Sequence, residues 1–141
     1  MKKYLVFLLA LTLGFSCTKE DPTQGSTSAT IEVTKDITTE TIWEDVTEDP
    51  NAIDYLIKQP ELTVTAGLII KPGVIVAFES SSKIYVKSGG FLQAIGAVAK
   101  PIRFTGVLFS EGSWDGILFN TPDLRNELTH CIVEYAGGVN F

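Results

Sequence analysis

The sequence predicts an all-β fold in which short strands wind into a repeating coil, and three observations predict it. Between Leu62 and Phe104, apolar and polar residues alternate, which is the period of a strand with one buried face. Gly, Pro and Ser interrupt this alternation every few residues, as turns do. The apolar pairs also recur about one coil apart, a long-range repeat typical of a solenoid and not expected of a hairpin meander.

The first element along the chain is a hydrophobic leader, residues 1–16. Lys2 and Lys3 precede an apolar run from Tyr4 to Phe15, which is the order of a secretory signal. As a helix this run would reach about 18 Å at ~1.5 Å per residue, well short of the ~30 Å hydrocarbon core. A permanent membrane span is therefore not expected.

Cys17 follows a small residue at the end of this apolar run. The junction resembles the lipobox of bacterial lipoproteins, in the looser form found in Bacteroidetes-like bacteria, and Lys19, Glu20 and Asp21 resemble their surface-export signal. The resemblance implies that residues 1–16 are a lipoprotein signal peptide, that Cys17 is acylated, and that the chain is anchored in the outer membrane and exposed at the cell surface. Several acyl chains together would anchor it stably. An ordinary secretory signal with an incidental cysteine is the alternative.

Residues 17–30 form the second element, a flexible tether. From Thr18 to Thr30 the chain holds no large apolar residue and is rich in Ser, Thr, Gly and Pro. Without residues 1–16 the chain keeps 9 of its 11 basic and all 17 acidic residues, a net charge of −8. Such a chain is a poor partner for nucleic acid and for anionic membrane surfaces.

Residues 31–61 form an irregular, acidic segment that we expect to cap the first coil, with Trp43 closing that end. The run "WEDVTEDPNAID", residues 43–54, offers oxygen ligands for calcium but lacks the spacing and the glycine of an EF-hand loop. A solvated acidic loop is the expected state, and no cofactor is predicted. Calcium remains the weaker alternative.

Residues 62–141 form the coils. Their apolar residues pair off at a spacing of two and are expected to point inward; within the regular part they are Leu62, Val64, Leu68, Ile70, Val74, Val76, Phe78, Ile84, Val86, Leu92, Ala94, Ile102 and Phe104.

These pairs repeat along the chain, and each pair is expected to lie beside its match in the next coil. The expected matches are Leu62/Val64 with Ile84/Val86, Leu68/Ile70 with Leu92/Ala94, Val76/Phe78 with Ile102/Phe104, and in a looser third pass Leu92/Ala94 with Ile117/Phe119 and Ile102/Phe104 with Cys131/Val133.

The order of "LTVTAGLIIKPGVIVAF", "KIYVKSGGFLQAIG", "KPIRFTG", "WDGILF" and "CIVEYAGG" resembles the opening of the right-handed parallel β-helix family of bacterial surface proteins, which is pectate-lyase-like. The resemblance covers about residues 37–138. It implies about three coils behind an N-terminal capping segment, truncated or uncapped at the C-terminus. A two-layer sandwich of antiparallel strands is the alternative.

The sequence predicts neither a catalytic set nor a metal site. His130 and Cys131 are neighbours on a predicted strand, and adjacent strand residues point to opposite faces. His130 is therefore expected at the surface, and Cys131 is expected to be a buried, unpaired thiol. Zinc would lack ligands at a usable spacing.

Two function classes remain. Polysaccharide lyases and glycoside hydrolases occur on the resembling fold, but the coils hold few acids and no two are expected on a shared outer face. Tyr85 and Phe91 are expected to point outward, where aromatic rings can stack on sugars. For Phe91, packing under a loop is the alternative. We therefore expect a surface-anchored protein for adhesion or binding, to glycans or to a partner protein. The alternative is the N-terminal part of a lyase or hydrolase whose catalytic coils lie downstream.

Overall fold

The computed structural model describes residues 29–47 and 49–137. These residues form twelve short strands, and no helix among them is long and apolar enough to cross a membrane. The predicted all-β class is confirmed.

The strands form three sheets in which all pairs of neighbouring strands are parallel. Sheet A contains, in spatial order, β1 (Ile31–Val33), β3 (Tyr55–Ile57), β6 (Ile75–Phe78), β9 (Ile102–Gly106) and β12 (Cys131–Val133). Sheet B contains β4 (Glu61–Val64), β7 (Lys83–Val86) and β10 (Gly116–Phe119). Sheet C contains β2 (Thr41–Trp43), β5 (Gly67–Ile70), β8 (Phe91–Ile95) and β11 (Glu127–Thr129).

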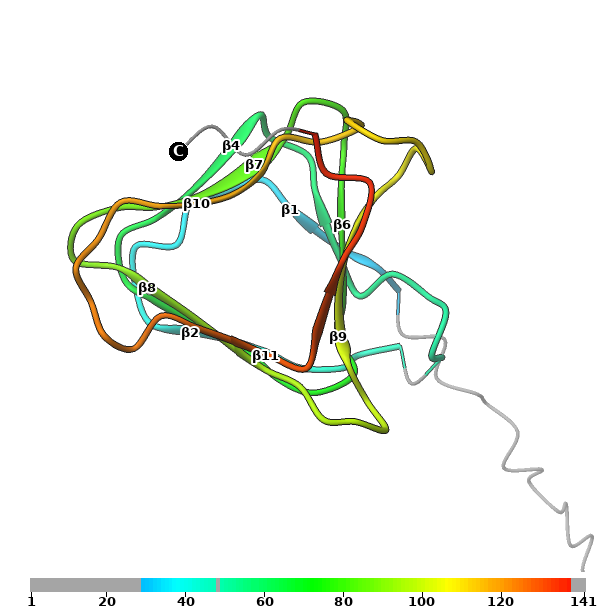
Figure 1. Ribbon diagram of the computed structural model, residues 1–141, viewed down its shortest axis with the longest axis horizontal. Helices are drawn as coiled ribbons and strands as arrows, with labels where there is room; N and C mark the ends of the chain where they lie inside the picture. The colour runs from blue at the N-terminus through cyan, green and yellow to red at the C-terminus, as the bar shows by residue number, and fades with distance from the viewer. Residues whose placement is uncertain (1–28, 48, 138–141) are drawn as a thin grey trace, which may run out of the picture.

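The chain visits the three sheets in a fixed order. Strands β4, β5 and β6 belong to sheets B, C and A, and the next two sets of three strands repeat that order. In Figure 1 the sheets form the three sides of a triangular outline. Two parallel strands need a crossover between them, and here the strands of the other two sheets supply it. This arrangement is compatible with a parallel β-helix.

The inward-facing residues predicted from the alternation are confirmed as the core. All thirteen are at most 1% exposed. Because side chains alternate between the two faces of a strand, one buried residue in two is enough to fill the space between the three sheets. The residues between them point away from this core.

The predicted repeat is confirmed for the first two pairs of strands and wrong for two later matches. Leu62 pairs with Ile84, and Leu68 pairs with Leu92, as expected. Val76, however, pairs with Phe104, whereas Ile102 is its predicted partner. A slip of two positions leaves every side chain on the same face, so the alternation cannot detect it.

The second wrong match concerns Ile117, which is predicted to follow Leu92. Ile117 instead pairs with Ile84 in sheet B. Residues 107–115 connect β9 to β10, and this longer connection delays the return to sheet B. The predicted match of Ile102 with Cys131 is confirmed in sheet A.

The segment predicted to cap the first coil also contributes strands. β1 and β3 extend sheet A and β2 extends sheet C, while Ile37 makes a parallel bridge to Val64 of sheet B. Trp43 is buried there, and its ring stacks on that of Tyr55 with centroids 4.5 Å apart and planes 10° apart. This end of the core is therefore covered by aromatic rings.

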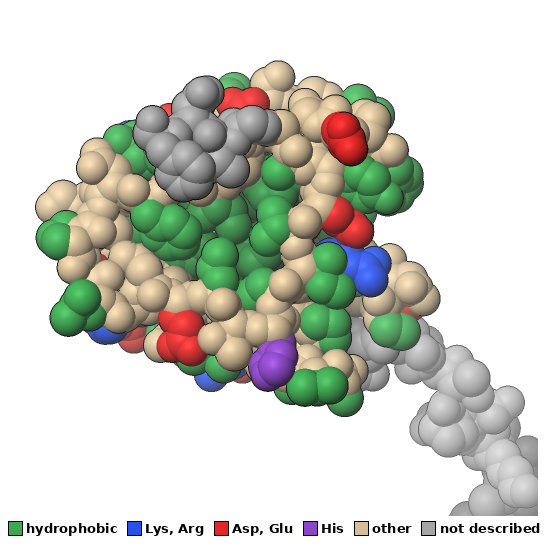
Figure 2. All heavy atoms as spheres, in the orientation of Figure 1, with side chains coloured by type: hydrophobic (Ala, Val, Ile, Leu, Met, Phe, Trp, Pro, Cys, Tyr) green, Lys and Arg blue, Asp and Glu red, His purple; other side chains and the backbone are tan. Residues whose placement is uncertain are grey.

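The other end is open among the described residues. Phe119, Leu128 and Val133 lie on the last strands of sheets B, C and A, in register with buried residues of the preceding strands, and all three are exposed. Figure 2 looks onto this end and shows hydrophobic side chains in the middle of the face, surrounded by polar groups and backbone.

Candidate functional site

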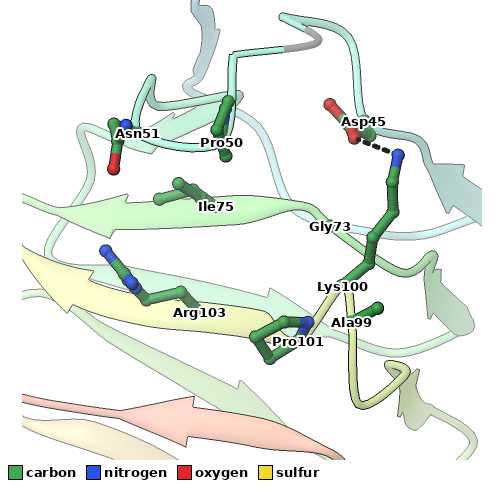
Figure 3. A pocket seen from close by; sticks show the side chains of 9 residues that line it. All are labelled: Asp45, Pro50, Asn51, Gly73, Ile75, Ala99, Lys100, Pro101 and Arg103. Atoms are coloured by element: carbon green, nitrogen blue, oxygen red, sulfur yellow. Dashed lines mark hydrogen bonds and ion pairs between the residues drawn. The ribbon is translucent and has the colours of Figure 1, made fainter.

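A cleft opens on the outer face of sheet A and holds about 470 Å³. This volume is within the range of small-molecule sites, about 300 to 1,000 Å³. Figure 3 shows its lining, which comes from the loop before β3, from β6 and β9, and from the turns that precede those two strands; the residues are Asp45, Pro50, Asn51, Gly73, Ile75, Ala99, Lys100, Pro101 and Arg103.

The floor of the cleft consists of outward-facing residues on two neighbouring strands. Ile75 of β6 and Arg103 of β9 are partners in the parallel register. Their chain neighbours Val74, Val76 and Ile102 point into the core, so Ile75 and Arg103 must point outward. An apolar and a cationic side chain therefore lie next to each other on the floor.

One wall is the loop that precedes β3, and a buried carboxylate holds it against sheet A. Asp54 is 1% exposed. Its Oδ1 accepts hydrogen bonds from the Val46 N–H and Thr47 N–H, both at 2.9 Å, and from the Thr47 hydroxyl at 3.0 Å. Its Oδ2 accepts from the Ile75 N–H at 2.8 Å. One side chain thus connects the wall of the cleft to its floor.

Tyr55 secures the beginning of the same loop. Its hydroxyl accepts a hydrogen bond from the Glu44 N–H at 3.1 Å, and its ring lies in the core against Trp43. Burial raises the pKa of Tyr55, so the hydroxyl stays neutral at physiological pH. The loop is therefore fixed at Glu44 as well as at Val46 and Thr47.

An ion pair closes one side of the cleft. Lys100 Nζ lies 3.4 Å from Asp45 Oδ2, across 55 residues of sequence. Lys100 is placed by a tight turn, in which its N–H donates to the Ala97 carbonyl and its own carbonyl accepts from the Ala97 N–H. Gly73 lies beneath the pair with φ +94°, and a Cβ there would stand 2.7 Å from Asp45 Oδ2. Glycine provides both the backbone conformation and the space.

The cleft carries more positive charge than the chain as a whole. Its lining has two cations, Lys100 and Arg103, and one acid, Asp45, a net charge of +1, whereas the whole chain has a net charge of −6. Arg103 Nε lies 3.8 Å from Glu134 Oε1, beyond hydrogen-bond distance, and within the described residues its guanidinium makes no hydrogen bond. Arg103 therefore forms a loose ion pair with Glu134, in which no hydrogen bond fixes the guanidinium.

The two aromatic residues predicted to contact a ligand do not share a face. Tyr85 lies on β7 of sheet B and Phe91 on β8 of sheet C. Phe91 is 5% exposed, as the alternative of a ring packed under a loop requires. It points outward in its strand, but the guanidinium of Arg125 lies over its ring at 3.9 Å from the centroid. A loop far along the chain therefore covers it.

Tyr85 is half-buried and surrounded by polar groups. Its hydroxyl accepts a hydrogen bond from Asn120 Nδ2 at 2.8 Å, and Lys87 Nζ lies 4.7 Å from its ring centroid. The same Lys87 donates to Glu61 Oε1 at 2.9 Å, and this hydrogen bond lowers the pKa of Glu61 and raises that of Lys87.

The ion pair between Asp123 and Arg125, in the loop over Phe91, predicts how the stability of the fold depends on pH. Arg125 donates from its side chain to both oxygens of Asp123, at 2.6 and 2.9 Å, and this lowers the pKa of Asp123 to about 2 from its usual 3.8. Because the folded pKa lies below the unfolded one, the contact stabilises the fold above about pH 4 and is lost as the pH falls toward 2.

An NMR titration of the Asp123 carboxyl carbon is expected to show a midpoint near 2 in the unmodified chain and a higher midpoint in Arg125→Gln. The midpoint of the variant is expected to stay below 3.8, because the N–H of residue 125 still donates to Asp123 Oδ1. A midpoint near 3.8 in the unmodified chain would show that the pair does not form.

The remaining predicted residues are placed as follows. Cys17, Lys19, Glu20 and Asp21 lie outside the described residues. His130 is exposed, as expected, but in a bend with φ +49°. Cys131 is half-buried, and burial raises the pKa of its thiol.

Within residues 29–47 and 49–137, no group of three or more His, Cys, Asp or Glu side chains is placed to hold a metal ion. The carboxylate of Asp54, which belongs to the acidic run weighed as a calcium ligand, is instead surrounded by hydrogen-bond donors of the protein.

The residues of the cleft were not predicted from the sequence. The one available signal was Arg103, a polar residue between two inward-facing apolar ones, but many outward positions share that pattern.

In comparisons with known proteins, no protein-family model, curated protein or solved structure matches the chain.

Proposed function

We propose that the chain is a surface-anchored lipoprotein that binds glycans through the outer face of a right-handed parallel β-helix. The observation that carries this proposal is the cleft on the outer face of sheet A, in which the apolar side chain of Ile75 lies beside the cationic side chains of Lys100 and Arg103. An apolar surface with a few placed polar groups is typical of sites for small rings. A concave site of this size suits a sugar better than it suits the flat surface of a protein. A partner protein is therefore the second candidate ligand.

The right-handed β-helix is supported by the path of the chain. Each set of three strands passes once through sheets B, C and A and then pairs in parallel with the set before it. Connections between parallel strands of one sheet are right-handed in about 98% of cases. With such a fold, side chains between the buried ones form long outer faces, on which binding sites can be built without disturbing the core.

The proposed location at the cell surface rests on the residues that precede the first strand in the sequence. Cys17 at the end of the apolar leader supports lipid anchoring, and Lys19, Glu20 and Asp21 support export to the outer face of the outer membrane. The tether of residues 17–30 would span roughly 20 Å as a random coil, enough to hold the sheets away from the lipid. Glycans of the surroundings would then reach the cleft.

The anchor is tested by labelling cells with radioactive palmitate. The chain is expected to carry the label, and Cys17→Ala is expected to lose it completely, because an amide- or thioether-linked acyl group needs the cysteine. Cys131→Ala serves as the matched control and is expected to label as strongly as the unmodified chain. Retention of label in Cys17→Ala would refute the anchor.

The binding function is tested on an array of neutral and charged saccharides with the purified chain held in detergent micelles. Saturable binding to a defined subset is expected. The matched control is the same chain after heat denaturation. Absence of saturable binding to every saccharide on the array would contradict a role in glycan binding.

A further inference from the structure

We infer that two copies of the chain pair end to end through β12, the last described strand of sheet A, and so form a symmetric dimer. The inference goes beyond the proposed function and does not rest on it. It is carried by the free edge of β12, by exposed apolar side chains at the open end, and by two complementary polar residues that flank the strand.

The edge of β12 presents backbone groups that the described residues leave unpaired. In sheet A, β12 has β9 as its one described neighbour. The His130 carbonyl and the Glu134 N–H both bond to β9, at 3.1 and 3.0 Å. Because the backbone groups of successive strand residues point to alternate sides, those of Cys131 and Val133 point toward the free edge.

The side chains of β12 do not protect this edge. Exposed sheet edges are commonly blocked by charged side chains or by proline, and an apolar edge without them is a site of association. The strand Cys131–Val133 holds neither. Ile132 is 38% and Val133 49% exposed, so both faces of the strand present apolar surface. Figure 2 shows further hydrophobic side chains in the middle of this end.

A second copy of the same strand matches this edge. In an antiparallel pair centred on Ile132, the two Ile132 residues lie opposite each other, and Cys131 of each copy lies opposite Val133 of the other. The edge-facing groups of these residues then form two pairs, each of which exchanges two hydrogen bonds. A shift by one residue would place edge-facing groups opposite groups that are already bonded to β9.

The same register brings complementary polar groups together. His130 of each copy lies beside Glu134 of the other, because both residues are two positions from Ile132. His130 is exposed, and within the described residues its imidazole makes no hydrogen bond or ion pair. Glu134 keeps its loose ion pair with Arg103, and a carboxylate can accept further hydrogen bonds. Hydrogen bonds to a carboxylate are stronger than those to a neutral acceptor.

The difference between the two ends of the core favours pairing of like ends. Trp43 and Tyr55 cover the core at the first coil, whereas Leu128 and Val133 are exposed at the last. Two open ends that meet bury apolar surface on both copies, whereas an open end against a covered one gains less. Contact between identical surfaces closes the assembly at two copies.

The dimer would place its two clefts on one surface. Sheet A would continue across the two-fold axis with five strands from each copy. The two Arg103 residues would be separated by three strand spacings, about 14 Å at ~4.8 Å per spacing. A ligand with two binding units could then engage both clefts, with a higher overall affinity than one cleft provides.

The test places a cysteine on the two-fold axis. Opposite residues of a non-hydrogen-bonded antiparallel pair have Cα atoms about 4.5 Å apart, which is within the range of a disulfide. Ile132→Cys, combined with Cys131→Ala, is therefore expected to form a covalent dimer when the purified full chain in detergent micelles is treated with a mild oxidant. Non-reducing gel electrophoresis measures the dimer.

Two controls accompany this variant. Cys131→Ala alone measures any linkage through Cys17. Glu32→Cys, also combined with Cys131→Ala, carries its cysteine at an exposed position on β1, the opposite edge of sheet A. It is expected to give no more dimer than Cys131→Ala alone.

A further variant tests the polar contact. His130→Glu, added to the variant with Ile132→Cys, places two carboxylates beside each other at both ends of the strand pair. Like charges directly opposite each other destabilise a ladder, so dimer formation is expected to slow at least about fivefold. Thr34→Glu adds the same charge at an exposed position of the first coil and is expected to leave the rate unchanged.

Three results would each overturn the inference: no linkage through Ile132→Cys above that of Cys131→Ala, equal linkage through Glu32→Cys, or an unchanged rate with His130→Glu. Circular dichroism of the variants should match that of the unmodified chain, because residues 32, 34, 130 and 132 are exposed.

Discussion

Replacing Asp54 with alanine is expected to lower the free energy of unfolding by about 3 kcal/mol and to remove ligand binding at the cleft. The carboxylate accepts four hydrogen bonds, three from Val46 and Thr47 and one from the Ile75 N–H. Removing it leaves these donors without partners, and a buried donor without a partner costs about 1 to 3 kcal/mol. The loop donors can turn to water, but the Ile75 N–H cannot, because it lies beneath the loop.

Urea denaturation followed by circular dichroism measures this loss. Asp54→Asn is expected to lose about half as much, because the amide oxygen can still accept the three loop hydrogen bonds while its NH₂ group faces the Ile75 donor. Asp49→Ala is the matched control from the same loop. Asp49 is exposed, and its side chain accepts a hydrogen bond from the Asn51 N–H at 2.9 Å. A change below about 1 kcal/mol is therefore expected for this control.

The Asp54 variants also test whether the loop before β3 forms part of the binding site. If Asp54→Ala is as stable as the unmodified chain, the loop is not held as described. If it is destabilised yet binds the saccharides selected on the array with full affinity, the loop wall is not part of the binding site.

Replacing Trp114 with alanine is expected to lower the free energy of unfolding by about 4 kcal/mol, because large-to-small changes of a buried aromatic cost about 3 to 5 kcal/mol. Trp114 is fully buried, and its ring stacks on Phe78 with centroids 4.0 Å apart and planes 6° apart. Its Nε1 donates to the Glu134 carbonyl at 2.9 Å. The residue therefore joins the last described strands to the preceding core.

Two further variants separate the contributions of Trp114. Trp114→Phe keeps a ring over Phe78 but loses the hydrogen bond to Glu134, so a loss of about 1 kcal/mol is expected. Phe109→Ala is the matched control from the neighbouring connection, since Phe109 is 79% exposed and meets only the edge of the Tyr135 ring, at 5.7 Å. Equal losses for Trp114→Ala and Phe109→Ala in urea denaturation would show that Trp114 is not buried.

The sequence was sufficient to predict which residues face the core, because burial on a strand repeats every second residue and local alternation reveals it. It was less reliable for register. Val76 pairs with Phe104, and the predicted partner, Ile102, would place the same faces inward. The long connection before β10 similarly displaced Ile117 from the predicted sheet, since connection length has no signature in the alternation.

The outer surface was harder to predict, because it depends on contacts between distant parts of the chain. Phe91 points outward as the alternation requires, yet Arg125, from the loop between β10 and β11, covers it. Lys100 and Asp45 are 55 residues apart and form one side of the cleft. Each of these residues is ordinary in its local sequence, and only the arrangement of the sheets brings them together.

The central claim, that the cleft on sheet A is the binding site, is tested most directly by NMR. Titration of the purified chain with a saccharide that binds on the array is expected to shift the backbone amides of Asn51, Ile75, Lys100 and Arg103 together, with one affinity, and to leave those of Tyr85 and its neighbours unchanged. Shifts gathered around Tyr85, or spread evenly over the three sheets, would contradict the claim.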